Sequence, residues 1–195
     1  MPPKAKFTKE EIIDAAVGIV REFGLDQLTA RALSARLSSS ARPIFTVFEG
    51  MEEVQSEVKI AARKIYDGYI RAGLSAKSKN EPCFKRVGEQ YVLFAMTEPK
   101  LFQLLFMTEQ PRVEPFCKVL PTIEDSYAEI LGSIKSAYGL SERSAVRVYE
   151  HLWVYTHGIA TLCATRTCGF SKAEIGNMLS EAFAGIISVI KHEGE

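Results

Sequence analysis

Four cysteines and three histidines are the residues best suited to metal or nucleophilic chemistry in this 195-residue chain, and their spacing argues against both uses. Cys163 and Cys168 are separated by four residues, unlike the two-residue spacing of zinc and thioredoxin-like sites. His151 and His157 lie six residues apart, about 600° around a helix, so they point in different directions. Gly169–Ser171 lacks the second glycine of a serine-nucleophile turn and follows no predicted strand. We therefore expect no metal, no cofactor and no enzymatic activity; a redox switch between the two cysteines is the alternative.

The most informative pattern is a pair of short amphipathic segments joined by a three-residue turn. Thr29 precedes the first segment, residues 30–37, as a helix cap whose side chain accepts from a free amide. The serine cluster 38–40 predicts the turn, and its last serine can cap a second helix that runs to about Phe48. Pro43 then falls in the first turn of that helix, where its missing N–H costs little.

Two such short helices cannot bury an apolar face alone, so they require a third helix before them. Residues 8–11, Thr-Lys-Glu-Glu, fit a capping box at the start of that helix. One apolar stripe follows at helical spacing and comprises Ile12, Ala15, Ala16, Ile19, Val20 and Phe23. Gly24 ends the helix because glycine tolerates left-handed backbone. Three-helix units of this kind form helix-turn-helix DNA-binding modules, whose last helix lies in the major groove.

The remaining periodic segments also predict helix, because apolar residues recur at three and four positions and strand-type alternation is absent. These segments are residues 51–72, 83–97, 123–138, 142–167 and 171–192, with an apolar block at 101–107. A polar loop is expected at 73–82, and Pro111, Pro115 and Pro121 are expected to break the chain. A second capping box, at residues 171–174, opens the last helix. The fold is therefore predicted to be all-α.

Residues 11–48 resemble the DNA-binding domain of the TetR family of transcriptional regulators. The matching stretches are EEIIDAAVGIVREFGLDQLTARALSARL and, after the turn, SARPIFTVF. The family pattern ends in Ser-x-x-x-aliphatic-aromatic-x-x-Phe, and its fixed positions are occupied by Ser40, Ile44, Phe45 and Phe48. The resemblance implies an N-terminal three-helix helix-turn-helix domain, residues 1–50, and a C-terminal helical bundle that binds an effector and dimerises, residues 51–195.

The resemblance also implies which side chains meet DNA. Ile44 and Phe48 are expected in the core of the three-helix unit. Thr29 and Ser40 are caps first, and a cap also points amides toward phosphate. The expected DNA contacts are Lys6, Thr29, Arg31, Ser39, Ser40, Ala41, Arg42, Pro43, Phe45, Thr46 and Val47.

Three positions depart from the family pattern. Phe45 stands where relatives usually carry a tyrosine whose hydroxyl contacts a phosphate. Met51 stands where a lysine often holds backbone phosphate, and Ser38 stands where the turn usually has glycine. Val47 offers an apolar contact to a thymine methyl group. These changes leave open an alternative function, a helical ligand-binding or scaffold protein with a degenerate DNA-reading head.

A second resemblance lies further along the chain. Residues 153–158, Trp-Val-Tyr-Thr-His-Gly, resemble the Trp-x-x-x-His-Gly pattern in the effector domain of one TetR subgroup, and Tyr91–Met107 resembles the same subgroup. A ligand cavity needs apolar walls and a few polar groups, although each aromatic residue alone is more typical of a packed core. The expected ligand-binding residues are Tyr91, Phe94, Phe106, Tyr127, Trp153 and His157. The last two helices are rich in small residues, and the resemblance implies that they pair with their mates in a homodimer.

Composition leaves the DNA-binding prediction dependent on local charge, because the formal net charge of the chain is zero. Residues 1–48 carry seven Lys/Arg, including Lys4 and Lys9, and five Asp/Glu, a net charge of +2. We find no export signal and no long apolar run, so we expect a cytoplasmic protein with reduced thiols. The expected function is a ligand-responsive transcriptional regulator, a repressor released from a palindromic double-stranded DNA operator by a small apolar or amphipathic effector.

Overall fold

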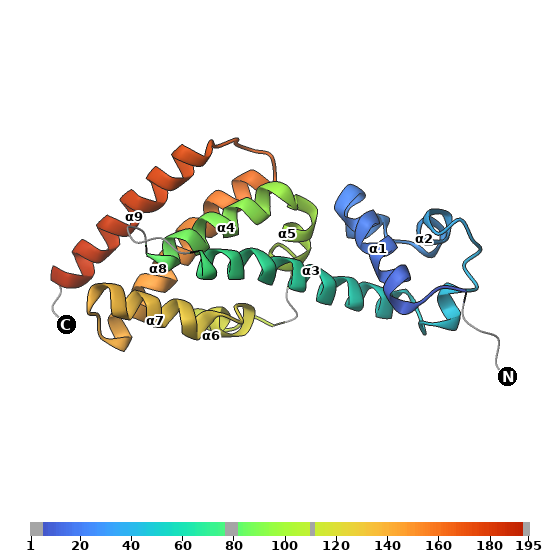
Figure 1. Ribbon diagram of the computed structural model, residues 1–195, viewed down its shortest axis with the longest axis horizontal. Helices are drawn as coiled ribbons and strands as arrows, with labels where there is room; N and C mark the ends of the chain where they lie inside the picture. The colour runs from blue at the N-terminus through green and yellow to red at the C-terminus, as the bar shows by residue number, and fades with distance from the viewer. Residues whose placement is uncertain (1–5, 77–81, 110–111, 193–195) are drawn as a thin grey trace. The chain divides into compact units, whose positions relative to one another are not determined.

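The computed structural model describes residues 6–76, 82–109 and 112–192, and the regular structure of these residues is entirely helical (Figure 1). This confirms the all-α prediction. The helices are α1 (Lys9–Phe23), α2 (Ala30–Arg36), α3 (Met51–Ser75), α4 (Cys83–Thr97), α5 (Pro99–Phe106), α6 (Phe116–Ile123), α7 (Tyr127–Tyr138), α8 (Glu142–Ala164) and α9 (Lys172–His192). Two short 3-10 helices, Leu25–Gln27 and Ile44–Thr46, lie between them.

The chain folds into two compact units. The first comprises Met1–Ile65 and Glu98–Thr108, and the second comprises Tyr66–Thr97 and Glu109–Glu195. The boundary therefore falls inside α3, and α5 belongs with the N-terminal helices. The functional division predicted at residue 50 concerns DNA and effector binding, and it stays a prediction.

In the first unit, α1 packs against α2 and α5. The predicted stripe of α1 forms the core here, because Ile12, Ala16 and Val20 are fully buried. The early turns of α3 add Val54 and Val58, which are also fully buried. Apolar side chains at three- and four-residue spacing thus gather on one side of each helix, as the sequence predicted.

In the second unit, α8 is the central helix and packs against α4, α7 and α9 (Figure 1). α4 also contacts α7 and α9, and α6 packs on α7. Ser141 caps α8 by accepting from the Ser144 amide at 3.2 Å, and Gly139 ends α7 in the left-handed region at φ 63°. α8 ends at Ala164, three residues before the predicted end, because Arg166 adopts a left-handed φ of 57°.

The predicted helix from Ser40 to Phe48 is not formed as an α-helix. Only Ile44–Thr46 is helical, and it is a single 3-10 turn. At the start of this turn, the Ile44 and Phe45 amides both donate to the carbonyl of Ala41, at 3.0 and 3.4 Å. Pro43 has no N–H to begin an α-helical ladder and restricts the residue before it, so the segment closes as turns.

The prolines after α5 also act differently from the prediction. Pro115 is the N-cap of α6 and Pro121 lies within that helix, so neither breaks it; Pro111 lies outside the described residues. Pro121 is exposed in a helix of eight residues. It has no N–H to donate to the carbonyl of Cys117, but Cys117 is exposed, so water can donate to that carbonyl instead. α3 runs three residues past the predicted end, and residues 77–81 of the predicted loop lie outside the described residues.

Candidate functional site

Caps predicted from the sequence fix where α1 and α2 begin. The Glu11 amide donates to Thr8 Oγ1 at 3.1 Å and the Thr8 amide donates to Glu11 Oε2 at 2.8 Å, which confirms the capping box. The Ala32 amide donates to Thr29 Oγ1 at 3.1 Å. Each cap satisfies an amide that the helix itself leaves without a partner, so the starts of both helices are well defined.

The segment between α2 and α3 is anchored by two apolar side chains. Ile44 is fully buried and Phe48 is 2% exposed, which confirms that both belong to the core. Ser38 opens the turn with a left-handed φ of 48°, and this explains why glycine suits that position. Because the two anchors face inward, Arg42 and Phe45 are left exposed on the outside of the segment.

Each predicted DNA contact is exposed or half-buried. The Lys6 ammonium donates to Ser39 Oγ at 3.0 Å, which ties the N-terminal tail to the turn. The Thr46 hydroxyl donates to the carbonyl of Pro43 at 2.7 Å and so stabilises its own turn. The structure thus presents these side chains together on one segment and its tail, while their contact with DNA stays a prediction.

Two other cations of this unit, Lys9 and Arg36, are held by acidic partners. Lys9 Nζ lies 2.6 Å from Glu57 Oε1, and Arg36 Nη1 lies 3.0 Å from Glu22 Oε2. The side chain of Lys9 is therefore engaged with α3, which weakens its case as a DNA contact. Lys4 lies outside the described residues.

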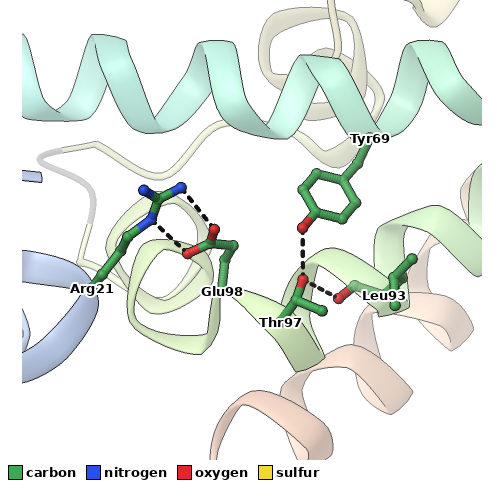
Figure 2. A network of polar contacts seen from close by, with 5 residues as sticks. All are labelled: Arg21, Tyr69, Leu93, Thr97 and Glu98. Carbon is green, nitrogen blue, oxygen red and sulfur yellow. Dashed lines mark hydrogen bonds and ion pairs between the residues drawn. The ribbon is translucent and has the colours of Figure 1, made fainter. Parts of the chain in front are cut away.

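An ion pair in the first unit ties α1 to the start of α5. Arg21 Nε and Nη2 donate to the two carboxylate oxygens of Glu98 at 2.9 and 2.8 Å, a bidentate arrangement (Figure 2). Glu98 directly precedes α5, whose Leu101 and Phe102 are fully buried. The residue before Glu98 is Thr97, the last of α4, so α4 continues within one residue into the segment held by α1.

The second unit encloses a cavity of about 40 Å³ with mainly aromatic and aliphatic walls. Two predicted ligand-binding residues, Tyr91 and Trp153, line it. Phe84, Tyr149 and Thr156 line it as well. We call this space the inner cavity. It combines apolar walls with a few polar groups, as a small-molecule site requires.

Glu124 also lines the inner cavity, and the sequence prediction missed it. It follows α6 directly and is 3% exposed. The Tyr66 hydroxyl and the Ser126 amide both donate to its carboxylate, the latter at 3.2 Å. Burial is the main cause that raises the pKa of Tyr66 well above its ordinary value, so its phenol keeps the proton that it donates. The one sequence signal for Glu124 was its position four residues after Leu120, on a helix face whose other residues are apolar.

His157 is placed by two of the other predicted ligand-binding residues. Tyr91 Oη lies 2.9 Å from His157 Nδ1, and the Trp153 ring stacks on the imidazole at 4.7 Å between centroids and 10° between planes. Burial lowers the pKa of His157, so the imidazole is neutral near pH 7. These three side chains therefore form one cluster at the wall of the inner cavity.

The other predicted ligand-binding residues lie elsewhere. Phe94 is fully buried and packs edge-on against Tyr66 at 5.5 Å, as a core residue does. Tyr127 stacks at 5.3 Å on Tyr149, which lines the inner cavity. Phe106 belongs to the first unit, where its ring packs on Phe102 at 5.1 Å and beneath the Arg63 guanidinium at 5.5 Å.

A second space of about 110 Å³, the outer cavity, adjoins the inner one. The two share Phe84, Gly88, Leu152 and Thr156 as lining residues, so they lie next to each other. Its other walls include Tyr138 and Phe183, whose rings lie 4.8 Å apart, and it also receives Lys85. The sequence prediction did not include these residues because they come from α4, α7 and α9, which only the fold brings together.

The outer faces of α8 and α9 carry exposed apolar side chains. Val154 and Val189 are 54% and 55% exposed, and an open groove of about 710 Å³ runs beside Phe116, Val154 and Ile186. By length and composition alone, α9 is also apolar enough to cross a membrane. A surface of this kind is typical of a helix that is covered in an assembly.

The cysteines and histidines form no cluster with metal-ligand character within residues 6–76, 82–109 and 112–192. All four thiols are free, with Cys163 buried and Cys168 exposed. Burial raises the pKa of the Cys163 thiol, so it is less reactive than a free cysteine.

A capped three-element head with an exposed turn, together with a helical unit that encloses apolar cavities, defines the class of helix-turn-helix transcriptional regulators. Residues 84–184 match the family model of the tetracyclin repressor-like C-terminal domain, and the chain belongs to the TetR family of DNA-binding transcriptional regulators. The family consists of non-enzymatic regulators, which agrees with the expectation that this chain is not an enzyme. The subgroup suggested by the Trp-x-x-x-His-Gly pattern stays a prediction.

Two relatives are consistent with this membership. The chain is 23% identical over 172 residues to YobS, an uncharacterised HTH-type transcriptional regulator of Bacillus subtilis (strain 168), and the match covers 84% of this chain and 83% of that protein. Its fold is similar to the crystal structure of a protein from Mesorhizobium loti MAFF303099 assigned to the TetR family, with a TM-score of 0.56 and 16% identity. That match covers 92% of this chain and 95% of the other.

Proposed function

We propose that this regulator is a cytoplasmic homodimeric repressor that leaves a palindromic operator when a small apolar or amphipathic effector binds its second unit. Helix α4 provides the main support for this proposal. Its Phe84 and Tyr91 line the cavities, and the chain passes from its last residue directly to Glu98, which holds Arg21 of α1. A ligand that repositions α4 therefore acts on a segment fastened to the DNA-reading head.

Helix α3 provides a second continuous connection. Its early residues Val54 and Val58 are buried in the first unit, and its Tyr66 donates to Glu124 at the inner cavity. An effector can change DNA affinity only if it binds the two shapes of the protein with different affinities. Side chains of α3 and α4 lie at the inner cavity, and the chain continues from both helices into the first unit. This continuity supplies a physical route by which ligand binding can change DNA affinity.

The DNA-binding part of the proposal is tested by titrating the protein against a fragment from its own promoter region and against random DNA over a salt series. We expect the promoter fragment to bind roughly a thousandfold tighter or more at physiological salt. Arg42→Ala should weaken binding and lower the salt slope by about one, because one phosphate contact is lost. Arg36→Ala is the matched control, since Arg36 is paired with Glu22, and it should leave the slope unchanged.

Equal affinity for the promoter fragment and random DNA, with no effect of Arg42→Ala, would contradict the repressor proposal. That result would favour the alternative of a ligand-binding protein with a degenerate DNA-reading head. Phe45 is the observation behind this alternative, because it is 45% exposed and its ring offers no donor to a phosphate.

A further inference from the structure

We infer that the effector is an organic amine, whose protonated nitrogen lies in the inner cavity against Glu124 and whose apolar body fills the outer cavity. The inference deepens the proposed function, and only the role of the ligand as an effector rests on that function. The binding site itself is argued from the walls of the two cavities.

The charge of the inner cavity favours a cationic ligand. Among its described lining residues, Glu124 is the only carboxylic acid, and none is a lysine or an arginine. His157, which contacts the lining residues Tyr91 and Trp153, is neutral near pH 7 because burial lowers its pKa. Two donors, the Tyr66 hydroxyl and the Ser126 amide, are directed at the carboxyl group, and hydrogen bonds donated to a carboxylate favour its anionic form. A cationic ligand group would stabilise that form further.

The aromatic walls favour the same sign of charge. Phe84, Tyr91, Tyr149 and Trp153 line the inner cavity, and aromatic faces attract cations through the ring quadrupole. This attraction is stronger where water is excluded, and Tyr91 and Tyr149 are 3% and 7% exposed. A carboxylate within an aromatic enclosure selects an ammonium group against a neutral or anionic one.

The sizes of the two spaces set the shape of the ligand. The inner cavity, about 40 Å³, exceeds the space that one water needs and suits a compact group such as a primary ammonium. The outer cavity, about 110 Å³, is close to the roughly 150 Å³ in which an apolar protein cavity accepts benzene. Phe183 and Tyr138 supply apolar walls there. Since the two cavities share four lining residues, a six-carbon chain joined to one amine is the ligand shape that the two volumes together suggest.

Three probes of equal length and different charge test the inference on the full-length protein without DNA. Binding of hexylammonium, 1-hexanol and hexanoate is measured by calorimetry and by the shift in melting temperature. We expect hexylammonium to bind roughly tenfold or more tighter than hexanol, and hexanoate to bind more weakly than either. Equal or tighter binding of hexanoate, or no binding of any probe at millimolar concentration, would overturn the inference.

Two variants separate the charge of Glu124 from the integrity of the cavity. Glu124→Gln keeps the side-chain shape and an acceptor for Tyr66, so it should weaken hexylammonium binding roughly tenfold or more while hexanol binding is unchanged. Glu129→Gln, at an exposed position of α7, is the matched control and should change neither. If Glu124→Gln bound hexylammonium as tightly as the unaltered protein, Glu124 would not be the counter-charge. Should that variant fail to fold, the comparison of the three probes on the unaltered protein still decides.

Failure of this inference is distinguishable from failure of the proposed function. If hexylammonium binds in the expected order but leaves operator affinity unchanged, the amine site stands and the role of its ligand as an effector is wrong. If the operator is bound specifically while none of the probes bind, the repressor proposal stands and the amine site is wrong.

Discussion

Ser38 is a non-glycine residue held at a φ of 48°, at the turn that orients the exposed segment of the head. The left-handed region costs an L-residue roughly 1–2 kcal/mol, and glycine avoids that cost but loses about 0.5–1 kcal/mol of chain entropy. We therefore predict that Ser38→Gly raises the free energy of unfolding by about 0.5 kcal/mol. Urea denaturation measures it, and Ser40→Gly, at a position without positive φ, should lower it.

Tyr66 is the second residue whose contribution to stability can be measured, through its hydroxyl group. Tyr66→Phe removes a donor from the buried carboxylate of Glu124 and should cost about 1–3 kcal/mol of unfolding free energy. Tyr69→Phe is the control on the same helix, because its hydroxyl lies 2.8 Å from Thr97 Oγ1, an exposed bond (Figure 2). That change should cost under about 1 kcal/mol. Equal losses for the two variants would show that the Glu124 contact has no special weight.

At this scale the sequence predicted local interactions well and distant ones poorly. Thr8, Thr29 and Ser171 were recognised as caps because a cap and its amide lie three residues apart. Glu124 was missed because its partner Tyr66 is 58 residues away, and no local pattern links them. Phe106 was assigned to the ligand site by aromatic character alone, while its packing partners lie in the first unit.

At the scale of the helices, Gly73 marks a position where the backbones of α3 and α4 lie close together. A Cβ at this position would lie 2.9 Å from the Val87 Cα and 3.1 Å from the Arg86 carbonyl carbon, both backbone atoms that cannot turn aside. Gly73→Ala should therefore destabilise the protein by about 1–3 kcal/mol through overpacking. The effect appears as a lower melting temperature and a lower urea midpoint.

Gly68 provides the control within the same helix, since a Cβ there meets no atom within 4 Å. Gly68→Ala should stabilise the protein by about 0.5–1 kcal/mol through helix propensity. Opposite signs at two glycines five positions apart would establish that packing on α4, and not helix formation, sets the outcome at Gly73. Two changes of the same sign would contradict the close approach.

The helices themselves were mostly predictable, because amphipathic spacing, caps and stop signals are local. Apart from shifted helix ends, the two main exceptions contain proline. The segment at Pro43 was predicted as an α-helix and forms 3-10 and simple turns, whereas the chain at Pro121 was predicted to break and remains helical. Proline removes one hydrogen bond in both places, and packing decides whether the rest of the turn survives.

At the scale of the whole molecule, the exposed apolar faces of α8 and α9 predict self-association. Val154→Glu and Val189→Glu each place a charge on the surface that we propose to be buried between protomers, at side chains 54% and 55% exposed in one chain. We expect a shift from dimer to monomer in light scattering coupled to gel filtration. Operator affinity should fall in parallel, because two heads bind one palindrome.

Ile60→Glu is the matched control for this prediction. Ile60 is 50% exposed and lies on α3 in the first unit, whereas the two helices proposed for the dimer belong to the second unit. This variant should remain dimeric. Loss of the dimer by all three substitutions would indicate a general loss of folding, and retention by all three would contradict an interface made by α8 and α9.

The assignment of α5 to the N-terminal unit bears on how new regulators of this family can be assembled. Leu101 and Phe102 complete the packing of α1, although more than fifty residues of chain separate them from the end of the exposed turn. A chimera that joins the first 65 residues of this protein to a foreign sensor would strip α1 of those side chains and of the Glu98 carboxylate. Swapping specificities between such proteins therefore demands a discontinuous graft, with residues 98–108 travelling alongside the N-terminal helices.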